Sequence, residues 1–163
     1  MPTEQLAELT QPQRDRLAFV ELRVRFIGEI RRQDLVSRFG IQSAAATRDL
    51  AVYKDLSSGN IDYDSKAKSY VLTDEFRPLF DFPPERVLSW LTQGFGDGEP
   101  MRLKPWVISE VPTRLTHPDL DVLAAVTRAI HQECPLAIEY HSISSGCTER
   151  EIVPFALIDN GLR

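Results

Sequence analysis

The sequence predicts an α+β fold, with helices leading into short strands in both halves of the chain. Between residues 14 and 56, apolar residues recur at helical spacing in three successive segments. Two strand-like segments follow at 60–64 and 69–72. After residue 118 a further amphipathic helical pattern leads into stretches that alternate apolar and polar residues. Helices and antiparallel strands that are segregated along the chain are typical of α+β proteins.

The first two helices are predicted over 14–30 and 33–39. The first has apolar residues at helical spacing between arginines and glutamates, and the second has Asp34 in its first turn, where a negative charge suits the helix dipole. Gly40 is expected to end the second helix, because glycine adopts the left-handed conformation at no steric cost. Ile41 is then placed to fill the angle between the second and third helices.

The third helix, predicted over 43–56, has unusually small side chains on its outer face. Its buried positions follow from helical spacing and are Ala46, Leu50 and Tyr53. This spacing leaves Thr47 and Arg48 exposed among alanines. A slim helix of this kind suits the major groove of B-DNA, which is ~12 Å wide and admits an α-helix when the leading side chains are not bulky.

A basic hairpin completes the N-terminal region. The two strands, 60–64 and 69–72, flank a polar turn that carries Lys66 and Lys68. Three helices and such a hairpin predict a winged helix-turn-helix, with the hairpin as the wing that contacts phosphates. The residues predicted to contact DNA come from the segment just before the second helix, the third helix and the wing: Arg31, Arg32, Ser43, Ala44, Ala45, Thr47, Arg48, Lys54, Lys66 and Lys68.

Charge is distributed unevenly along the chain. The net charge of -5 argues mildly against nucleic-acid binding, because neutralising phosphates needs a surplus of lysine and arginine. Between residues 23 and 54, however, basic residues outnumber acidic ones, so the predicted helix-turn-helix is locally positive. A protein-interaction module built on a winged helix remains the alternative, since this fold does not always bind DNA.

The remaining chain is predicted to form a linker and a second folded region. A helix is expected from Pro84, with Val87, Leu88 and Leu91 on one face, and it is followed by an extended linker in which Trp106 is a buried anchor. A helix over 118–132 should lead into a strand from Pro135 and a second strand from Glu149, with Pro154 at a bulge or edge. The predicted domains are 1–82, 83–118 and 119–163.

The end of the sequence predicts an incomplete domain. The last hairpin would expose Ile152, Phe155 and Leu157 with no third strand to cover its edge. We therefore expect the chain to be a fragment or a natural truncation.

The C-terminal run resembles the start of a WYL domain, in which a helix leads into an Sm- or SH3-like β-barrel. The motif R-x-I-x-P-x-A-L is present as Arg150, Ile152, Pro154, Ala156 and Leu157. Together with "RFIGEIRRQDLVSRFGIQSAAATRDL" and the wing, the chain is similar to the N-terminal part of WYL transcription regulators of the CapW/BrxR type, which control bacterial anti-phage defence loci. Gln42 stands where a serine cap commonly begins the recognition helix, so the cap is expected at Ser43.

The resemblance implies a homodimeric repressor that binds a double-stranded DNA operator. It also implies ligand sensing by the WYL domain, with a nucleic-acid-derived ligand. Tyr140, Ser142 and Arg150 fall where the sensing residues of this family lie in the first two strands.

Other functional classes are less well supported. His131, Cys134, His141 and Cys147 offer metal ligands, but their spacing matches no tight zinc pattern, so no metal or other cofactor is expected. The sequence has no G-x-S-x-G, H-E-x-x-H or phosphate-binding glycine loop, and no enzyme activity is predicted. Without a signal-like N-terminus or an apolar run of the ~20 residues that a membrane span requires, the protein is expected to be cytoplasmic.

Overall fold

The computed structural model describes residues 6, 8–93, 109–110, 118–142 and 146–158. The chain divides into two compact units, Met1–Phe82 and Pro83–Arg163, each of which is described by itself. Trp106 and the expected linker around it lie outside the described residues, apart from Ser109 and Glu110. Within the described parts of the chain, no helix is long and apolar enough to span a membrane.

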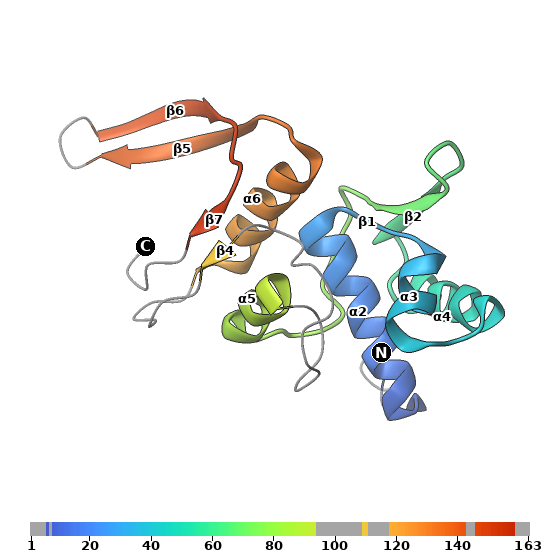
Figure 1. Cartoon of the computed structure of the whole chain (residues 1–163). Helices are drawn as coiled ribbons and strands as arrows, with labels where there is room; N and C mark the ends of the chain where they lie inside the picture. Colours follow the sequence, from blue (N-terminus) through green and yellow to red (C-terminus); the bar gives the residue numbers. More distant parts are fainter. Residues whose placement is uncertain (1–5, 7, 94–108, 111–117, 143–145, 159–163) are drawn as a thin grey trace. The chain divides into compact units, whose positions relative to one another are not determined.

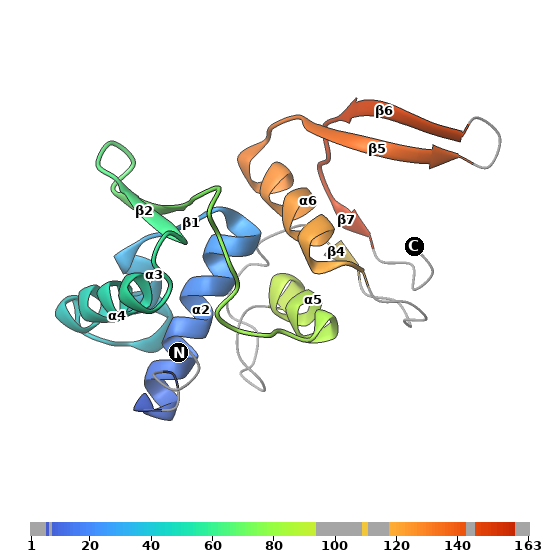
Figure 2. The same cartoon turned by 180° about the vertical axis from the view of Figure 1, so that it is seen from behind.

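The described part of unit 1, from Gln11 onwards, contains three helices and a small sheet, and the α+β fold class is confirmed. Its helices are α2 (Gln11–Ile27), α3 (Arg32–Phe39) and α4 (Ser43–Leu56), and its strands are β1 (Glu29–Ile30), β2 (Ile61–Asp64) and β3 (Ser69–Leu72). Both α3 and α4 contact α2, and the sheet lies at the C-terminal end of α2 (Figure 1, Figure 2).

The first helix ends earlier than its apolar pattern predicted. Gly28 adopts a left-handed conformation with φ 94°, and its N–H bonds the carbonyls of Arg23 and Val24, which ends α2 at Ile27. Residues 29–30, which were expected to be helical, instead form β1. This strand pairs antiparallel with β3, so the wing is a three-stranded sheet in the order β1-β3-β2 rather than a two-stranded hairpin.

The helix-turn-helix follows the sequence pattern closely. Gly40 ends α3 with φ 64°, and α4 has the predicted bounds. Ala46, Leu50 and Tyr53 are buried as predicted. The expected cap at Ser43 is wrong: Ser43 is already helical, and Gln42 occupies the cap position without a side-chain hydrogen bond.

The core of unit 1 is centred on α2. In the C-terminal part of this helix, residues on most sides are buried. Its fully or nearly buried residues are Leu17, Phe19, Val20, Glu21, Leu22, Val24, Arg25, Phe26 and Ile27. Contacts with α3, α4, β1 and β3 surround the helix, which explains why its buried surface is wider than a single amphipathic stripe.

Unit 2 contains two helices and two small sheets among its described residues. Its elements are α5 (Pro84–Gln93), β4 (Ser109–Glu110), α6 (Leu120–Gln132), β5 (Leu136–Ser142), β6 (Gly146–Ile152) and β7 (Leu157–Ile158). Val87, Leu88 and Leu91 are buried on α5, as their spacing predicted. The Asp119 carboxylate caps α6 by accepting hydrogen bonds from the N–H groups of Asp121 and Val122.

The final strand was predicted to pair back onto the strand before it, and β6 does pair antiparallel with β5. The predicted continuation through Pro154 is wrong, because β6 ends at Ile152, two residues before that proline. The next strand, β7, pairs parallel with β4, which lies within the segment expected to be a linker. Proline lacks the N–H that a ladder requires, which accounts for the break between the two strands.

Candidate nucleic-acid interface

The outer surface of α4 carries small and polar side chains. Ser43, Ala44, Thr47, Arg48 and Ala51 are exposed, whereas Ala45 is partly exposed. Apart from Arg48, none of these side chains is bulky, because alanine, serine and threonine extend little beyond the helix backbone. The first half of α4 therefore presents a narrow edge to solvent, as the sequence predicted.

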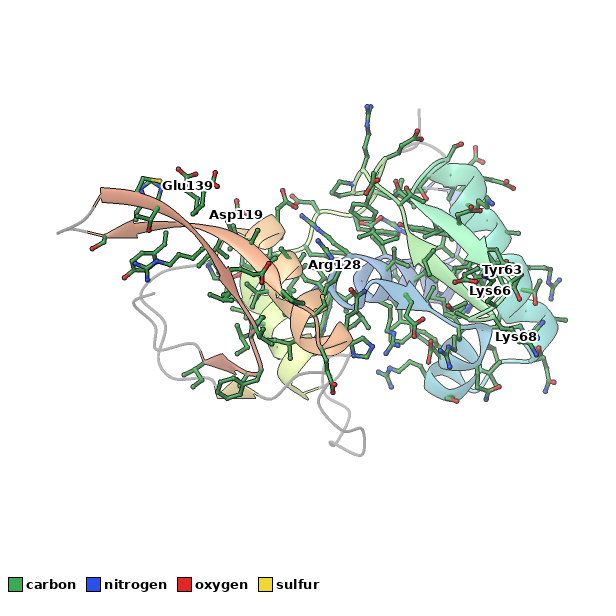
Figure 3. The ribbon with its side chains drawn as sticks, turned by 90° about the horizontal axis from the view of Figure 1, so that it is seen from above. Tyr63, Lys66, Lys68, Asp119, Arg128 and Glu139 are labelled. Carbon is green, nitrogen blue, oxygen red and sulfur yellow. The ribbon has the colours of Figure 1, made fainter. Side chains whose placement is uncertain are left out.

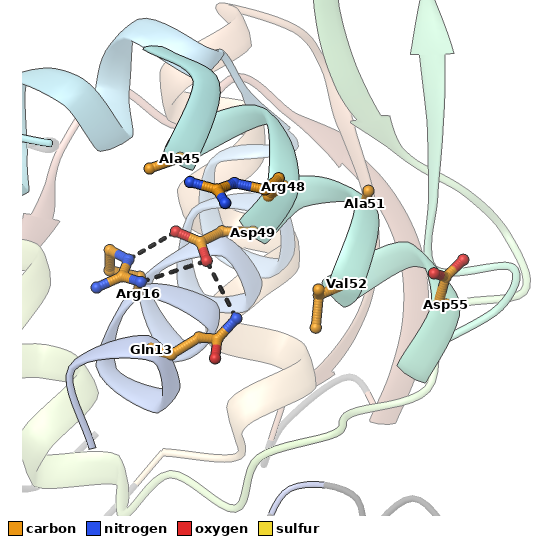
Figure 4. Close-up of a pocket in the computed structure, with 8 residues that line it drawn as sticks. All are labelled: Gln13, Arg16, Ala45, Arg48, Asp49, Ala51, Val52 and Asp55. Atoms are coloured by element: carbon orange, nitrogen blue, oxygen red, sulfur yellow. Dashed lines mark hydrogen bonds and ion pairs between the residues drawn. The ribbon is translucent and has the colours of Figure 1, made fainter. Parts of the chain in front are cut away.

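Arg48 lies at the rim of a pocket between α2 and α4 (Figure 4). The pocket is lined by Gln13, Arg16, Ala45, Arg48, Asp49, Ala51, Val52 and Asp55. At its base the Asp49 carboxylate accepts two hydrogen bonds from Arg16, at 2.6 Å from Nε and 3.3 Å from Nη2. Gln13 donates a third hydrogen bond to Asp49 at 3.4 Å. These contacts join the start of α2 to the middle of α4.

Thr47 links α4 to the preceding helix. Its hydroxyl donates to the Ser43 carbonyl at 3.0 Å and accepts a hydrogen bond from Arg32 Nη1 at 3.4 Å. The structure therefore brings Arg32 and Thr47 together on the exposed side of the helix-turn-helix. Arg32 sits at the first position of α3, so its guanidinium extends the basic surface beyond α4.

The β2–β3 turn holds its two lysines at the tip of the hairpin (Figure 3). The Asp64 carboxylate accepts hydrogen bonds from the N–H groups of Lys66 and Ala67, at 2.7 and 3.1 Å. This arrangement is an Asx turn, in which a side chain replaces a backbone acceptor. Lys68 closes the turn with φ 54°. Both lysine side chains are exposed.

Two of the predicted DNA-contacting cations already have acidic neighbours. Lys54 Nζ lies 3.6 Å from Asp62 Oδ1, and Arg31 Nη2 lies 3.5 Å from Glu29 Oε1. Lys54, Asp62 and Arg31 are exposed and Glu29 is partly exposed, and ion pairs at such positions contribute little to stability. Lys54 and Arg31 can therefore exchange these partners for phosphates at small cost.

A buried polar network fixes α4 against the rest of unit 1. Tyr53 donates its hydroxyl proton to Glu21 Oε2 at 3.0 Å and accepts a hydrogen bond from Asn60 Nδ2 at 3.2 Å. Glu21 also accepts hydrogen bonds from the backbone N–H groups of Leu79 and Phe80, both at 2.8 Å. The network thus joins α2, α4, the start of the wing and the segment that follows it.

Burial dominates the ionisation of this network. It raises the pKa of the Glu21 carboxyl from its ordinary 4.5 to about 7, although the N–H groups of Phe80 and Leu79 oppose the rise. Burial also raises the pKa of Tyr53, and the neighbouring Glu21 charge adds to that effect. The Tyr53 hydroxyl therefore remains protonated and acts as the donor to Glu21.

In unit 2, two of the three predicted sensing residues lie in contact. The Arg150 guanidinium lies over the Tyr140 ring, 4.2 Å from its centroid, and Arg150 Nε donates to the Thr148 hydroxyl at 3.3 Å. Ser142 lies two residues after Tyr140 on β5, and so on the same face of the strand. The hairpin thus groups these side chains on one face.

Sequence reasoning missed Glu21, Arg16 and Asp49 as determinants of this surface. Asp49 was counted only as a negative charge that offset the basic stretch. Asp49 lies three residues after Ala46 and four before Tyr53, and so beside the buried face of the helix. Because a buried carboxylate needs a partner, this position indicated that Asp49 would form an ion pair or hydrogen bonds. Nothing in the local pattern identifies Arg16 as that partner.

Comparison with known proteins assigns the chain to a family. Residues 12–93 match the family described as the BrxR transcriptional regulator winged helix-turn-helix domain. The chain is similar to proteins named "DNA-binding transcriptional repressor CapW", with 28% identity over 163 residues to that of Escherichia coli (strain KTE188) and 30% over 159 residues to that of Stenotrophomonas maltophilia. A third such relative, from Pseudomonas aeruginosa, is 28% identical over 164 residues.

These alignments cover 93% of this chain and 52% of each relative. The chain therefore spans about half the length of the curated relatives it matches. The family match covers the three helices and the wing that the sequence pattern predicted. The chain belongs to the family of transcriptional regulators that carry a BrxR-type winged helix-turn-helix domain.

Proposed function

We propose that the protein is a sequence-specific DNA-binding transcriptional repressor. The observation that carries this proposal is the narrow outer edge of α4, with Thr47 and Arg48 exposed, in the same unit as a lysine-bearing wing. The similar proteins are named "DNA-binding transcriptional repressor CapW", which supports the same function.

In this proposal α4 enters the major groove by its N-terminal half. The small side chains of Ala44 and Ala45 allow close approach, while Thr47 and Arg48 reach base edges or phosphates. The first N–H groups of α4 donate no hydrogen bond to the Gln42 side chain, which leaves those of Ser43 and Ala44 suited to a phosphate oxygen.

The wing supplies contacts that do not depend on sequence. Lys66 and Lys68 make no ion pair with another described residue, so their charges can neutralise phosphates directly. Arg31 and Arg32, at the start of α3, and Lys54, near the end of α4, extend the same role along the DNA backbone.

The finer parts of the proposal concern assembly and regulation. We infer a homodimer, because helix-turn-helix proteins usually read paired half-sites about one helical turn apart. The resemblance to CapW/BrxR-type regulators supports a phage-defence locus as the target. The grouping of Tyr140, Arg150 and Ser142 on one face of the β5–β6 hairpin supports ligand sensing there, with a nucleic-acid-derived ligand.

The test uses DNA from upstream of the protein's own gene cluster, titrated in a gel-shift or anisotropy assay. Arg48→Ala should weaken binding to the operator by roughly 5- to 150-fold, which corresponds to the ~1–3 kcal/mol of a base-edge contact. Arg48→Lys keeps the positive charge but loses the planar guanidinium group. It should weaken operator binding if Arg48 makes a bidentate contact with a base, and change binding little if Arg48 contacts only a phosphate. Folding should be unchanged, since Arg48 is exposed.

The wing variants should lose DNA binding in a different way from Arg48→Ala. Replacing Lys66 and Lys68 together by alanine should weaken specific and non-specific binding alike and flatten the salt dependence by roughly two logarithmic units per decade. Ala67→Ser, a neutral change in the same turn, is the matched control. If the Arg48 and lysine variants all bind operator DNA like the parent protein, the assignment of α4 and the wing as the DNA-contacting surface is wrong. If the parent protein binds no DNA, the protein-interaction alternative replaces the DNA-binding proposal.

A further inference from the structure

One face of the β5–β6 hairpin gathers a thiol, an imidazole and a carboxylate. His141 and Cys147 are directly opposite each other in the antiparallel register, and Glu139 lies two residues before His141 on the same strand. Residues two apart on a strand share a face, as do opposed residues on paired strands. The three side chains therefore lie together, near the end of the hairpin where Glu139 is marked in Figure 3.

The distances between their ligand atoms are short. Cys147 Sγ lies 3.8 Å from His141 Nε2, and His141 Nε2 lies 3.7 Å from Glu139 Oε1. The Cys147 thiol donates a hydrogen bond to Glu139 Oε1 at 2.6 Å. All three ligand atoms lie within 4.8 Å of one another, and all three residues are exposed.

These atoms suit a tetrahedral zinc ion. With Zn–S near 2.3 Å and Zn–N and Zn–O near 2.0–2.2 Å, tetrahedral angles place ligand atoms about 3.4–3.6 Å apart. The two distances to His141 Nε2 are already within a few tenths of an ångström of this range. The distance between Cys147 Sγ and Glu139 Oε1 is shorter because the thiol proton lies between these two atoms. It would lengthen by about 1 Å when a metal ion replaced that proton.

We propose that Glu139, His141 and Cys147 form a zinc-binding site on the outer face of the β5–β6 hairpin. A mixed thiolate, imidazole and carboxylate set favours Zn²⁺ over Mg²⁺ or Ca²⁺, which prefer oxygen ligands. On binding, the sulfur–proton bond breaks, a sulfur–zinc bond forms and the proton passes to solvent. The fourth coordination position is open to water or to a carboxylate.

Glu149 strengthens the case for a cation at this position. It pairs directly opposite Glu139, so two carboxylates face each other on the same side of the sheet, where like charges are unfavourable. A divalent cation beside Glu139 offsets this repulsion, and Glu149 is the carboxylate directly opposite Glu139 in the register.

The zinc site is distinct from the other functional surfaces. Tyr140 and Arg150 lie on the opposite face of the same hairpin, because they alternate with Glu139, His141 and Glu149 along the two strands. The zinc proposal does not depend on DNA binding, which we assign to unit 1. Its test can therefore fail while the DNA-binding proposal holds.

The test titrates the full chain with Zn²⁺ alone, in competition with a chromophoric chelator. We expect one zinc ion per chain, release of a proton and protection of Cys147 from alkylation, while Cys134 remains reactive. Mutating residues that only support metal ligands typically weakens metal binding by about 10- to 100-fold. Cys147→Ser and His141→Gln each remove a direct ligand, so each should weaken zinc binding by at least roughly tenfold. Both residues are exposed, so circular dichroism should show an unchanged fold.

The matched controls are Cys134→Ser and His131→Gln, which remove the other described cysteine and another histidine. Cys134 and His131 are not part of the three-residue group, so these variants should bind zinc like the parent chain. The proposal is overturned if the parent chain binds no zinc, or if the control variants lose as much zinc affinity as the Cys147 and His141 variants.

Discussion

The stability of unit 1 should fall as the pH rises from about 4.5 to 7, because of Glu21. Burial raises the pKa of this carboxyl to about 7 in the folded protein, whereas its ordinary value is 4.5. Between these values the folded state holds a proton that the unfolded state has lost. Raising the pH therefore favours the unfolded state, which is the opposite of the behaviour of a carboxylate whose pKa is lowered by an ion pair.

The magnitude follows from the difference between the two pKa values. Each pKa unit corresponds to about 1.4 kcal/mol, so the shift to about 7 amounts to about 3 kcal/mol once Glu21 is fully ionised in both states. This free energy is present below pH 4.5 and is lost progressively as the pH rises through 7. Glu21→Gln removes the titration but keeps a carbonyl oxygen that can accept from the Leu79 or Phe80 N–H.

The assay is urea unfolding of the parent chain and of Glu21→Gln at several pH values, followed by circular dichroism. The free energy of unfolding of Glu21→Gln relative to the parent should increase with pH by up to about 3 kcal/mol. Glu75→Gln makes the same exchange at an exposed position, and so it controls for the loss of a negative charge. A ¹³C NMR titration of the Glu21 carboxyl measures its pKa directly.

A difference between Glu21→Gln and the parent that stays constant from pH 5 to 8 would refute this reasoning. It would mean that the carboxylate stays ionised throughout and that its three hydrogen-bond donors outweigh burial. Those donors are the Tyr53 hydroxyl and the N–H groups of Leu79 and Phe80. The NMR titration would then give a pKa near or below 4.5.

Three further variants test other features of unit 1. Gly40→Ala should cost about 1 kcal/mol in urea unfolding, because φ 64° is strained for alanine although its Cβ would meet no atom within 4 Å. Arg16→Ala should destabilise by about 3 kcal/mol, since it leaves the Asp49 carboxylate, whose side chain is only 4% exposed, without its main partner. Asp62→Asn frees Lys54 from its acidic neighbour, and it should strengthen non-specific DNA binding in low-salt titrations without changing stability by more than about 0.5 kcal/mol.

The helix-turn-helix could be predicted from the sequence because its signals are local. The left-handed glycine after α3, the helical spacing of Ala46, Leu50 and Tyr53, and the two β-strand segments around a polar turn each lie within a few residues of one another. Such patterns determine the bounds of an element and its buried face without knowledge of the rest of the chain.

The elements that were wrongly predicted depend on distant partners. Residues 29–30 continue the apolar pattern of α2, and only Gly28 and the pairing with Val71 and Tyr70 of β3 make them a strand. The pairing of β7 with β4 joins residues about 48 positions apart, with no local sign of either partner. Two-residue strands are too short to show an alternating pattern.

The exposed residues of the candidate DNA-binding surface could be predicted from the sequence, but the buried contacts that hold α4 in place could not. Thr47 and Arg48 follow from helical spacing alone. The contacts that hold α4 in place, from Arg16 to Asp49 and from Tyr53 to Glu21, span more than 30 positions of sequence. Buried polar groups find partners by tertiary packing, so a single sequence shows that a partner is needed but not which residue supplies it.

The pairing of charges explains how an acidic chain can present a basic surface. Asp49, which offsets the local positive charge in the sequence, is buried against Arg16 and contributes little to the outer face of α4. Arg32, Arg48, Lys66 and Lys68 make no ion pair with any other residue that the structure describes, so their charges reach solvent uncompensated. Arg31 and Lys54 must first leave Glu29 and Asp62. The four unpaired cations should therefore dominate phosphate binding, and the net charge of -5 says little about this surface.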